Sequence, residues 1–147
     1  MSTLTDSGPD SVAALRQLVD RYNAAWNAQD LDAIMSMHAP DMVFENHTAG
    51  ERAEGAAVRE HIAEIFAGWP DLRFEGVRLY VSDGLIVQEW LARATHSKSI
   101  RRGTIEAPAS GKSLEWAGVD VIPTEGGLIK RKDVYSDSVG ILRQVGL

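Results

Sequence analysis

The prevailing spacing of apolar residues changes near Pro70, and that change limits the fold more than any other feature. Before it, apolar side chains recur every three or four residues, which predicts helices over residues 11–28 and 56–68 and a short helix from Asp30 that Pro40 ends. After it, glycine-containing turns separate β-rich runs, which predict strands over residues 74–81, 85–96, 113–122 and 128–135.

Two shorter elements complete the pattern: a strand over residues 42–46 and a last helical turn over 138–145. Helices followed by a run of strands are typical of the α+β fold class. We therefore predict a curved antiparallel sheet that wraps around the N-terminal helices and encloses an inner pocket. Residues 1–10 are expected to form a flexible N-terminus, and residues 11–147 a single domain.

Length and composition exclude several classes of function. A chain of 147 residues with 44% apolar residues can bury one core of its own, and without cysteines it has neither disulfides nor thiolate metal sites. The four histidines lack metal-ligand spacing, so we expect no metal. A net charge of −6 argues against nucleic acid as a partner, and short apolar runs argue against a membrane span. The expected location is the cytoplasm.

The last long strand contains a candidate catalytic carboxylate. Lys130 and Lys132 share one of its faces, which two lysines mark as facing solvent. Alternation then predicts that Arg131, Asp133 and Tyr135 point inward. A carboxylate such as Asp133 among aromatic side chains is partly desolvated, which raises its pKa into a range useful for proton transfer.

Nearly the whole chain resembles the nuclear transport factor 2-like superfamily, which includes ketosteroid isomerases, limonene epoxide hydrolases and SnoaL-type polyketide cyclases. The stretch 19–32, with Tyr22 and Trp26, is similar to the opening helix pair of ketosteroid isomerases. Later stretches, around His96 and over residues 107–112 and 137–146, resemble SnoaL-like cyclases. The resemblance implies a cone-shaped fold around a pocket for a small molecule.

The resemblance to ketosteroid isomerases also implies roles for three positions. Tyr22 and Asp120 match the tyrosine and the protonated aspartate that form the oxyanion hole of those enzymes. Asn46 stands where their proton-moving aspartate would be, and an amide cannot act as a carboxylate base. Two of the three catalytic positions of the isomerases, Tyr22 and Asp120, are therefore matched in this chain.

The other two families of the superfamily give partial matches. Against limonene epoxide hydrolases, Asn46 and Asp133 match, Phe44 replaces a tyrosine, and Trp90 with Ala92 replaces an arginine–aspartate pair. An epoxide hydrolase with a rearranged site is thus a less favoured alternative. SnoaL-type cyclases close a ring by an aldol reaction without a cofactor, and Asp133 is the candidate for their acid–base carboxylate.

We predict from these matches a cofactor-free isomerase or cyclase that acts on an apolar cyclic or polyketide-like carbonyl compound. Asp133 would remove a proton beside the carbonyl, while Tyr22 and a neutral Asp120 hydrogen-bond the developing enolate. The pocket residues expected to bind substrate are Phe44, Asn46, Trp90, His96, Trp116, Arg131 and Tyr135.

Structural roles compete for each catalytic candidate. Tyr22 fits a core tyrosine whose hydroxyl finds any partner, and Asp120 fits an ion pair with Arg131 on the neighbouring strand. Asp133 could also pair with Arg131, which would lower its pKa and weaken it as a base.

Two expectations concern activity and assembly. A non-catalytic module that binds a small ligand is the alternative function for the same fold. Val119 and Val121 are expected on the outer face of the sheet, where apolar side chains predict a homodimer.

Overall fold

The computed structural model describes residues 8–147. Residues 1–7 of the expected flexible segment lie outside the described residues, but Asp10 is well anchored. Its carboxylate accepts hydrogen bonds from the Thr124 hydroxyl and from the backbone N–H groups of Gly126 and Gly127, at 2.7–2.9 Å. The end of the predicted flexible segment is therefore tied to a turn of the sheet.

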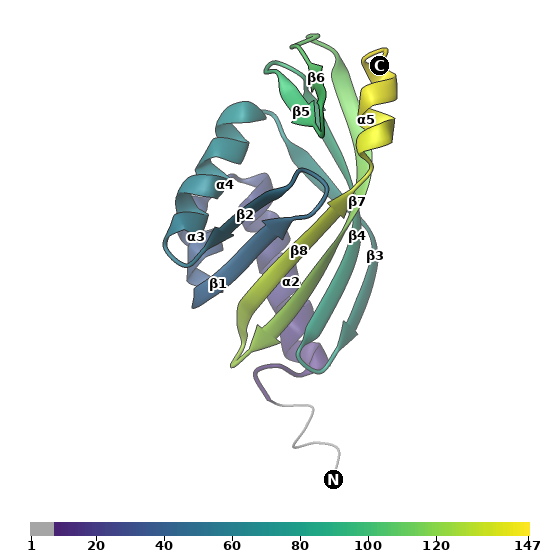
Figure 1. Ribbon diagram of the computed structural model, residues 1–147. Helices are drawn as coiled ribbons and strands as arrows, with labels where there is room; N and C mark the ends of the chain where they lie inside the picture. Colours follow the sequence, from purple (N-terminus) through teal and green to yellow (C-terminus); the bar gives the residue numbers. More distant parts are fainter. Residues whose placement is uncertain (1–7) are drawn as a thin grey trace.

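Four helices occupy the positions that apolar periodicity predicts, shifted by one or a few residues (Figure 1). The Ser11 hydroxyl caps the first helix by accepting from the Ala14 N–H, and the Asp30 carboxylate caps the second from Ala33. Pro40 does not end the second helix as predicted. The helix already ends at Ser36, and Pro40 lies within the strand that follows. The helices are α2 (Val12–Asn27), α3 (Leu31–Ser36), α4 (Ala57–Gly68) and α5 (Ser138–Gln144).

The strands form one curved six-stranded sheet in the order β2-β1-β8-β7-β4-β3 and a separate two-stranded hairpin, β5-β6. Neighbours in the large sheet are antiparallel except β1 and β8, which run parallel. Sequence patterning did not predict this parallel pair or the short strands β2, β5 and β6. The strands are β1 (His38–Asn46), β2 (Glu51–Glu54), β3 (Arg73–Ser82), β4 (Leu85–Thr95), β5 (Ile100–Arg102), β6 (Ile105–Ala107), β7 (Ser113–Glu125) and β8 (Leu128–Ser136).

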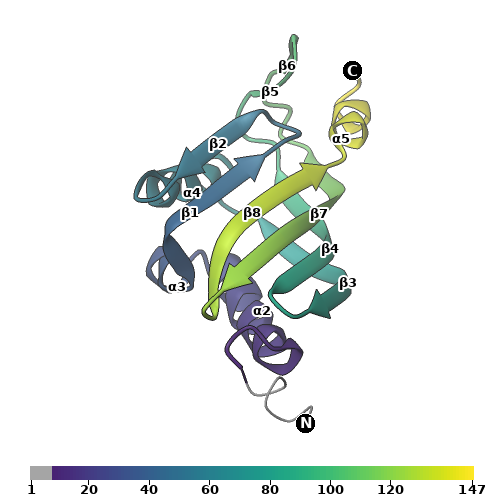
Figure 2. The same ribbon diagram turned by 60° about the horizontal axis from the view of Figure 1, so that its bottom comes forward.

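The core lies inside the curve of the sheet. Helix α2 crosses the concave face, and α3 and α4 cover the side where β1 and β2 lie (Figures 1 and 2). Helical spacing gives α2 a continuous apolar face, and its buried side chains Leu15, Tyr22 and Trp26 pack into the sheet. The predicted α+β architecture, a curved sheet around N-terminal helices, is confirmed.

A bulge in β8 decides which face of the sheet each of its side chains occupies. Against β7, Ile129 pairs with Thr124 and Asp133 pairs with Val121, so β8 has one extra residue between these pairs. The extra residue reverses the alternation of side chains. Ile129 and Lys132 are therefore both buried, and Asp133 lies on the outer face. The prediction that Lys132 faces solvent and Asp133 faces inward is wrong.

The β5–β6 hairpin and helix α5 stand together at one end of the molecule, beyond the tip of α4 (Figure 1). Within residues 8–147, no helix is long and apolar enough to cross a membrane.

Candidate functional site

A cavity of about 660 Å³ opens between the concave face of the sheet, helix α4 and the β5–β6 hairpin. This volume suits a small organic ligand. All four tryptophans of the chain line it, and they come from four different elements or loops: Trp26, Trp69, Trp90 and Trp116. Phe44 and Asn46 of β1 also line it, so four of the seven predicted substrate-binding residues lie at this cavity.

Asp120 of β7 and Lys132 of β8 face each other at the cavity, where the inner faces of the two strands meet. The Lys132 Nζ lies 3.7 Å from the Asp120 Oδ2, and both residues are more than nine-tenths buried. The other carboxylate oxygen, Oδ1, is buried without a hydrogen-bond partner among residues 8–147. A buried acceptor of this kind costs free energy unless a ligand satisfies it.

Burial acts in opposite directions on the two groups of this pair. Removal from water raises the pKa of Asp120, and the nearby Lys132 charge and the Trp90 indole oppose that rise. Burial lowers the pKa of Lys132, while Asp120 opposes that fall. Both groups are thereby brought closer to the range in which a proton can be exchanged at neutral pH.

Lys132 was missed as a site residue because alternation placed it in solvent. Its ammonium lies over the ring of Trp26 at 4.0 Å from the centroid, and the rings of Tyr22 and Phe44 are 4.9 and 5.3 Å away. Aromatic faces stabilise a cation where water is excluded. The aromatic cluster therefore allows an amine to be buried beside a carboxylate.

Gly118 determines the position of one cavity wall. It pairs across the β4–β7 ladder with Trp90, whose indole ring lies over it. A Cβ atom at position 118 would meet the Trp90 Cζ2 at 2.2 Å, closer than side-chain atoms approach. The absence of a side chain here therefore lets the indole lie flat against the sheet.

His61 of α4 is a second cavity residue that the sequence did not single out. Its ring lies edge-on to Phe44, with centroids 5.2 Å apart, and its Nε2 is buried without a partner among the described residues. The charged residues beside it in the sequence gave no signal that the imidazole would lie inward, at the cavity wall.

Tyr22 lies behind the cavity, not on its wall. Its hydroxyl is 2.8 Å from the Nε2 of buried His38, in a hydrogen bond. Burial raises the pKa of Tyr22 above its usual value and lowers the pKa of His38 to about 3, so both remain neutral near pH 7. Tyr22 therefore fits the structural role of a core tyrosine, with His38 as the partner of its hydroxyl. It also lines a small void of about 20 Å³ next to Asp120.

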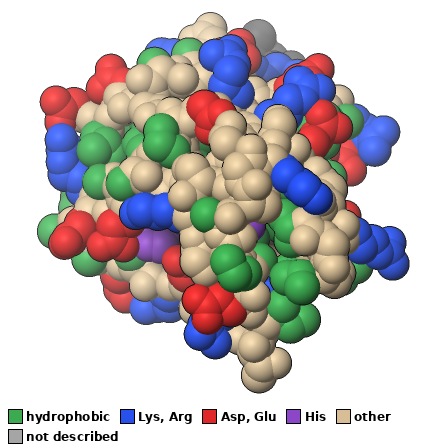
Figure 3. Space-filling model, turned by 90° about the horizontal axis from the view of Figure 1, so that it is seen from above, with side chains coloured by type: hydrophobic (Ala, Val, Ile, Leu, Met, Phe, Trp, Pro, Cys, Tyr) green, Lys and Arg blue, Asp and Glu red, His purple; other side chains and the backbone are tan. Residues whose placement is uncertain are grey.

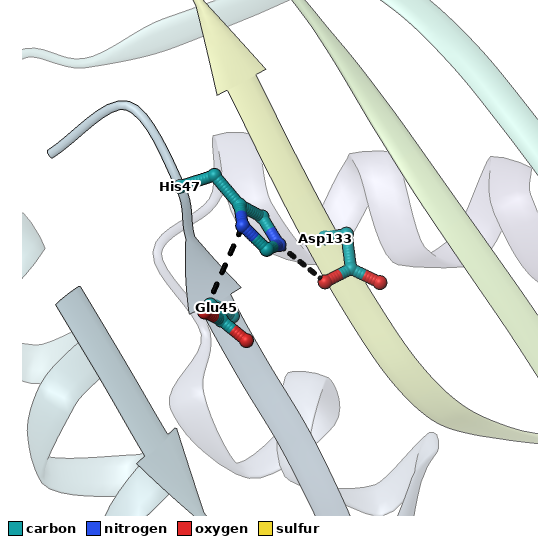
Figure 4. Close-up of side chains that lie close together, drawn as sticks. All are labelled: Glu45, His47 and Asp133. Carbon is teal, nitrogen blue, oxygen red and sulfur yellow. Dashed lines mark hydrogen bonds and ion pairs between the residues drawn. The ribbon is translucent and has the colours of Figure 1, made fainter. Parts of the chain in front are cut away.

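Three predicted site residues, Arg131, Asp133 and Tyr135, lie on the outer face of the sheet instead of in the pocket, because of the bulge in β8. The Arg131 guanidinium donates to both oxygens of Asp133 at 2.8 Å and to Glu45 at 2.6 Å. The His47 Nε2 lies 2.7 Å from the Asp133 Oδ1 (Figure 4). The same ring stacks on Tyr135. Partial burial acts to raise the pKa of Asp133. The hydrogen bonds from Arg131 and His47 outweigh this effect and leave the pKa below its usual value.

His96 also differs from its predicted position. It is fully buried, its Nδ1 bonds with the Ser110 hydroxyl at 2.8 Å, and its ring lies at 28° to the plane of Trp69 with centroids 6.3 Å apart. It is not among the residues that line the cavity. The expected ion pair of Asp120 with Arg131 is replaced by the pair with Lys132. At the positions compared with epoxide hydrolases, Trp90 and Ala92 are both buried apolar residues.

Among residues 8–147, one group of side chains has the composition of a metal site. Single ligand atoms of Glu45, His47 and Asp133 lie within 4.8 Å of one another (Figure 4). Histidine spacing along the sequence does not indicate this group because β1 and β8 bring it together. Arg131 already forms ion pairs with both carboxylates, and its guanidinium would repel a cation bound there.

Polar side chains surround the open end of the cavity. Arg101 and Arg102 of β5 and Glu51 of β2 line this rim. Figure 3 looks onto this end of the molecule and shows acidic, basic and hydrophobic side chains interspersed around it.

Comparison with known proteins agrees with this architecture. The family model of the SnoaL-like domain matches residues 19–132. A search of curated proteins found no match. Solved structures share the fold at low identity, as in a SnoaL-like polyketide cyclase from Agrobacterium tumefaciens strain C58, with 22% identity, a TM-score of 0.75, and coverage of 90% of this chain and 98% of that chain.

Two further structures are similar over nearly their whole length. TsrD from Streptomyces laurentii is 24% identical, with a TM-score of 0.74 and coverage of 91% and 96% of the two chains. A protein with a ketosteroid isomerase-like fold from Catenulispora acidiphila, solved with trimethylamine, is 20% identical, with a TM-score of 0.72 and coverage of 88% and 92%. The chain therefore belongs to the SnoaL-like domain family of the nuclear transport factor 2-like superfamily.

Proposed function

We propose that this protein is a cofactor-independent isomerase or cyclase that acts on an apolar cyclic or polyketide-like carbonyl compound. The observation that carries the proposal is the Asp120–Lys132 pair, which lies buried at a tryptophan-lined cavity with one carboxylate oxygen unpartnered among the described residues. An acid–base group and a cation beside an apolar cavity are what enolate chemistry needs.

Asp120 is the proposed base. Its ionised carboxylate, which lines the cavity, accepts a proton from the carbon next to the substrate carbonyl. A raised pKa makes the carboxylate a stronger base than an exposed aspartate while it is ionised. This assignment moves the base from Asp133, whose lowered pKa and place on the outer face do not suit the role.

Lys132 is the proposed electrophile. Its ammonium lies close enough to Asp120 to contact the carbonyl oxygen of a ligand whose neighbouring C–H faces Asp120, and it balances the negative charge that develops on the enolate oxygen. Such a charge is worth several kcal/mol in a site shielded from water. The surrounding aromatic rings keep the amine fixed, so little reorganisation accompanies the reaction.

Two outcomes are open to the enolate, and both return the proton. In an isomerisation, Asp120 delivers the proton to a different carbon of the same conjugated system. In a cyclisation, the enolate carbon attacks a second carbonyl carbon of the same molecule, and the resulting alkoxide takes the proton from Asp120. Each product is an isomer of its substrate, so neither reaction requires an oxidant or a reductant.

Exchange of substrate hydrogen for deuterium tests the proposal before the natural substrate is identified. Cyclic ketones, steroid enones and aromatic polyketide mimics are incubated with the protein in D₂O, and loss of the proton signal beside the carbonyl is followed by NMR. We expect Asp120→Asn to slow exchange by about 10²- to 10⁴-fold, the usual contribution of a general base. Lys132→Met should slow it as well, since the enolate loses its counter-charge.

Asp20→Asn is a matched control, because Asp20 is an exposed carboxylate on the outward side of α2. This variant should exchange at the native rate. If Asp120→Asn exchanges panel members as fast as the native protein, Asp120 is not the base. If the native protein binds them without accelerating exchange over the protein-free rate, the catalytic proposal is wrong and the protein is a binding module.

We also propose that two copies pair through the outer face of the sheet. Side chains in one row across four strands, Tyr80, Val87, Val121 and Asp133, combine apolar and charged groups. Tyr80 is 56% exposed, which is high for a large aromatic residue. Sedimentation at micromolar concentration should give a dimer, and Tyr80→Glu should give a monomer. A native monomer under these conditions contradicts the pairing.

A further inference from the structure

We infer that Arg102, at the rim of the cavity, selects substrates that have a carboxylate group. This inference rests on the proposed function of the cavity and narrows its substrate class to keto acids. Arg102 belongs to the β5–β6 hairpin, is half-buried, and lines the same cavity as Asp120 and Lys132. A ligand that fills this cavity therefore contacts the guanidinium and the buried pair together.

Arg102 differs from the other arginine of the rim in having no ion-pair partner. Arg101 is exposed and pairs with Glu106 at 3.3 Å. No carboxylate of residues 8–147 lies within ion-pairing distance of Arg102, and Glu51 acts on it only at longer range. Burial lowers the pKa of Arg102, so its charge is partly desolvated and unbalanced. A bound anion would supply the missing countercharge.

Two hydrogen bonds fix the guanidinium in one orientation. The Nε–H donates to the Ser138 hydroxyl at 2.7 Å, at the start of α5, and Nη1 donates to the backbone carbonyl of Arg101 at 2.8 Å. A guanidinium has five N–H donors, so three remain, one on Nη1 and two on Nη2. The Nη1–Nη2 end is the planar fork that binds both oxygens of a carboxylate. Because the fork is held in advance, little rotamer entropy is lost on binding.

The charges around the rim favour a carboxylate over a phosphate. Glu51 and Glu64 also line the cavity, and they would repel a doubly charged phosphate more than a singly charged acid. One planar guanidinium matches one planar carboxylate in charge and in shape. A keto acid would then lie with its acid group at the rim and its carbonyl near Lys132.

Pairs of ligands that differ only in this charge provide the test. Aromatic keto acids such as 6-acetyl-2-naphthoic acid are compared with their methyl esters by calorimetry. We expect the native protein to bind the acid roughly 10- to 100-fold more tightly than the ester, as a charged hydrogen-bonded contact gives. Arg102→Met should abolish this preference, so that the acid and the ester bind with similar affinity, and the remaining ester binding also shows that the variant is folded.

Two further variants separate charge from geometry. Arg102→Lys keeps the charge without the fork and should retain only part of the preference for the acid. Lys98→Met removes a cation from the same segment, at an exposed residue outside the cavity lining, and should retain all of it. The inference is overturned if the native protein shows no preference for acids across the panel, or if Arg102→Met keeps it.

The same ligands distinguish the inference from the proposed function. Deuterium exchange depends on Asp120, and acid preference depends on Arg102. If acids bind through Arg102 and no carbonyl compound exchanges, the inference stands and the catalytic proposal fails. If esters and acids exchange with equal efficiency, the catalytic proposal stands and the role of Arg102 is wrong.

Discussion

Adjacent strands place two aspartates in opposite surroundings on the two faces of one sheet. Asp120 is on the inner face with a single cation 3.7 Å away and one unpartnered oxygen among the described residues. Asp133 is on the outer face and is bonded by Arg131 and His47. The pKa is raised in the first case and lowered in the second. The satisfied carboxylate serves stability, whereas the unsatisfied one is available to a ligand.

The largest effect on stability is expected at the Asp120–Lys132 pair on the inner face of the sheet. Lys132→Met leaves Asp120 buried without its countercharge, which should reduce the free energy of unfolding by about 3–5 kcal/mol in urea denaturation at pH 7. The double variant Lys132→Met/Asp120→Asn removes both charges and should recover most of this loss. A single variant as stable as the native protein would show that the pair is not effectively buried.

The next effect concerns the wall of the cavity. Gly118→Ala forces the Trp90 ring away from β7 and should cost about 1–3 kcal/mol of unfolding free energy. Ligand affinity should change as well, because the ring lines the cavity. Ala117→Ser is the control on the exposed outer face of the same strand and should stay within about 0.5 kcal/mol of the native protein. Equal stability of the two variants would contradict the close contact at Gly118.

A smaller effect is expected in the hydrogen-bonded network on the outer face of the sheet, which joins Arg131, Asp133, Glu45 and His47. Asp133→Asn should lower the free energy of unfolding by about 1 kcal/mol at pH 7, since the network is partly solvated. The difference should shrink when the ionic strength rises to 1 M, because salt screens partly exposed charges. Deuterium exchange should continue at the native rate. Loss of exchange in Asp133→Asn would return the catalytic role to the outer face.

The smallest effect is a pair of opposite dependences on pH. The folded pKa of Asp133 lies below its ordinary value of 3.8, so the contribution of this carboxylate to stability is complete above pH 3.8 and is lost as pH falls through the folded pKa. The folded pKa of Asp120 lies above 3.8, so the folded state gains stability as pH falls from that pKa toward 3.8.

Unfolding measured against pH in three proteins tests these signs. The advantage of the native protein over Asp133→Asn should disappear in the acid range below pH 3.8. Its stability relative to Asp120→Asn should instead increase as pH falls toward 3.8. Parallel curves for both variants would mean that the two aspartates share one environment.

Periodicity predicted the helices and long strands because local spacing determines which face of each element is apolar. The site was predicted less well, since one inserted residue in β8 exchanged the faces of Lys132 and Asp133. The position of Val134 was a signal of this bulge. In a regular strand, residues at odd spacing lie on opposite faces, yet Ile129 and Val134 are both apolar and both buried. The sequence could not show that aromatic rings from α2 and β1 would stabilise Lys132, because those contacts join distant segments.

The parallel pairing of β1 with β8 has a consequence for the order of events during synthesis. Strand β1 is synthesised before its neighbour β8 and remains unpaired on that side until β2 to β7 have been made, because β8 follows them in the chain. Until then the edge of the β1–β2 hairpin has unpaired N–H and C=O groups that other chains could bind. The cavity is therefore assembled last, when β8 joins the β1–β2 hairpin to the remainder of the sheet and brings Lys132 to Asp120.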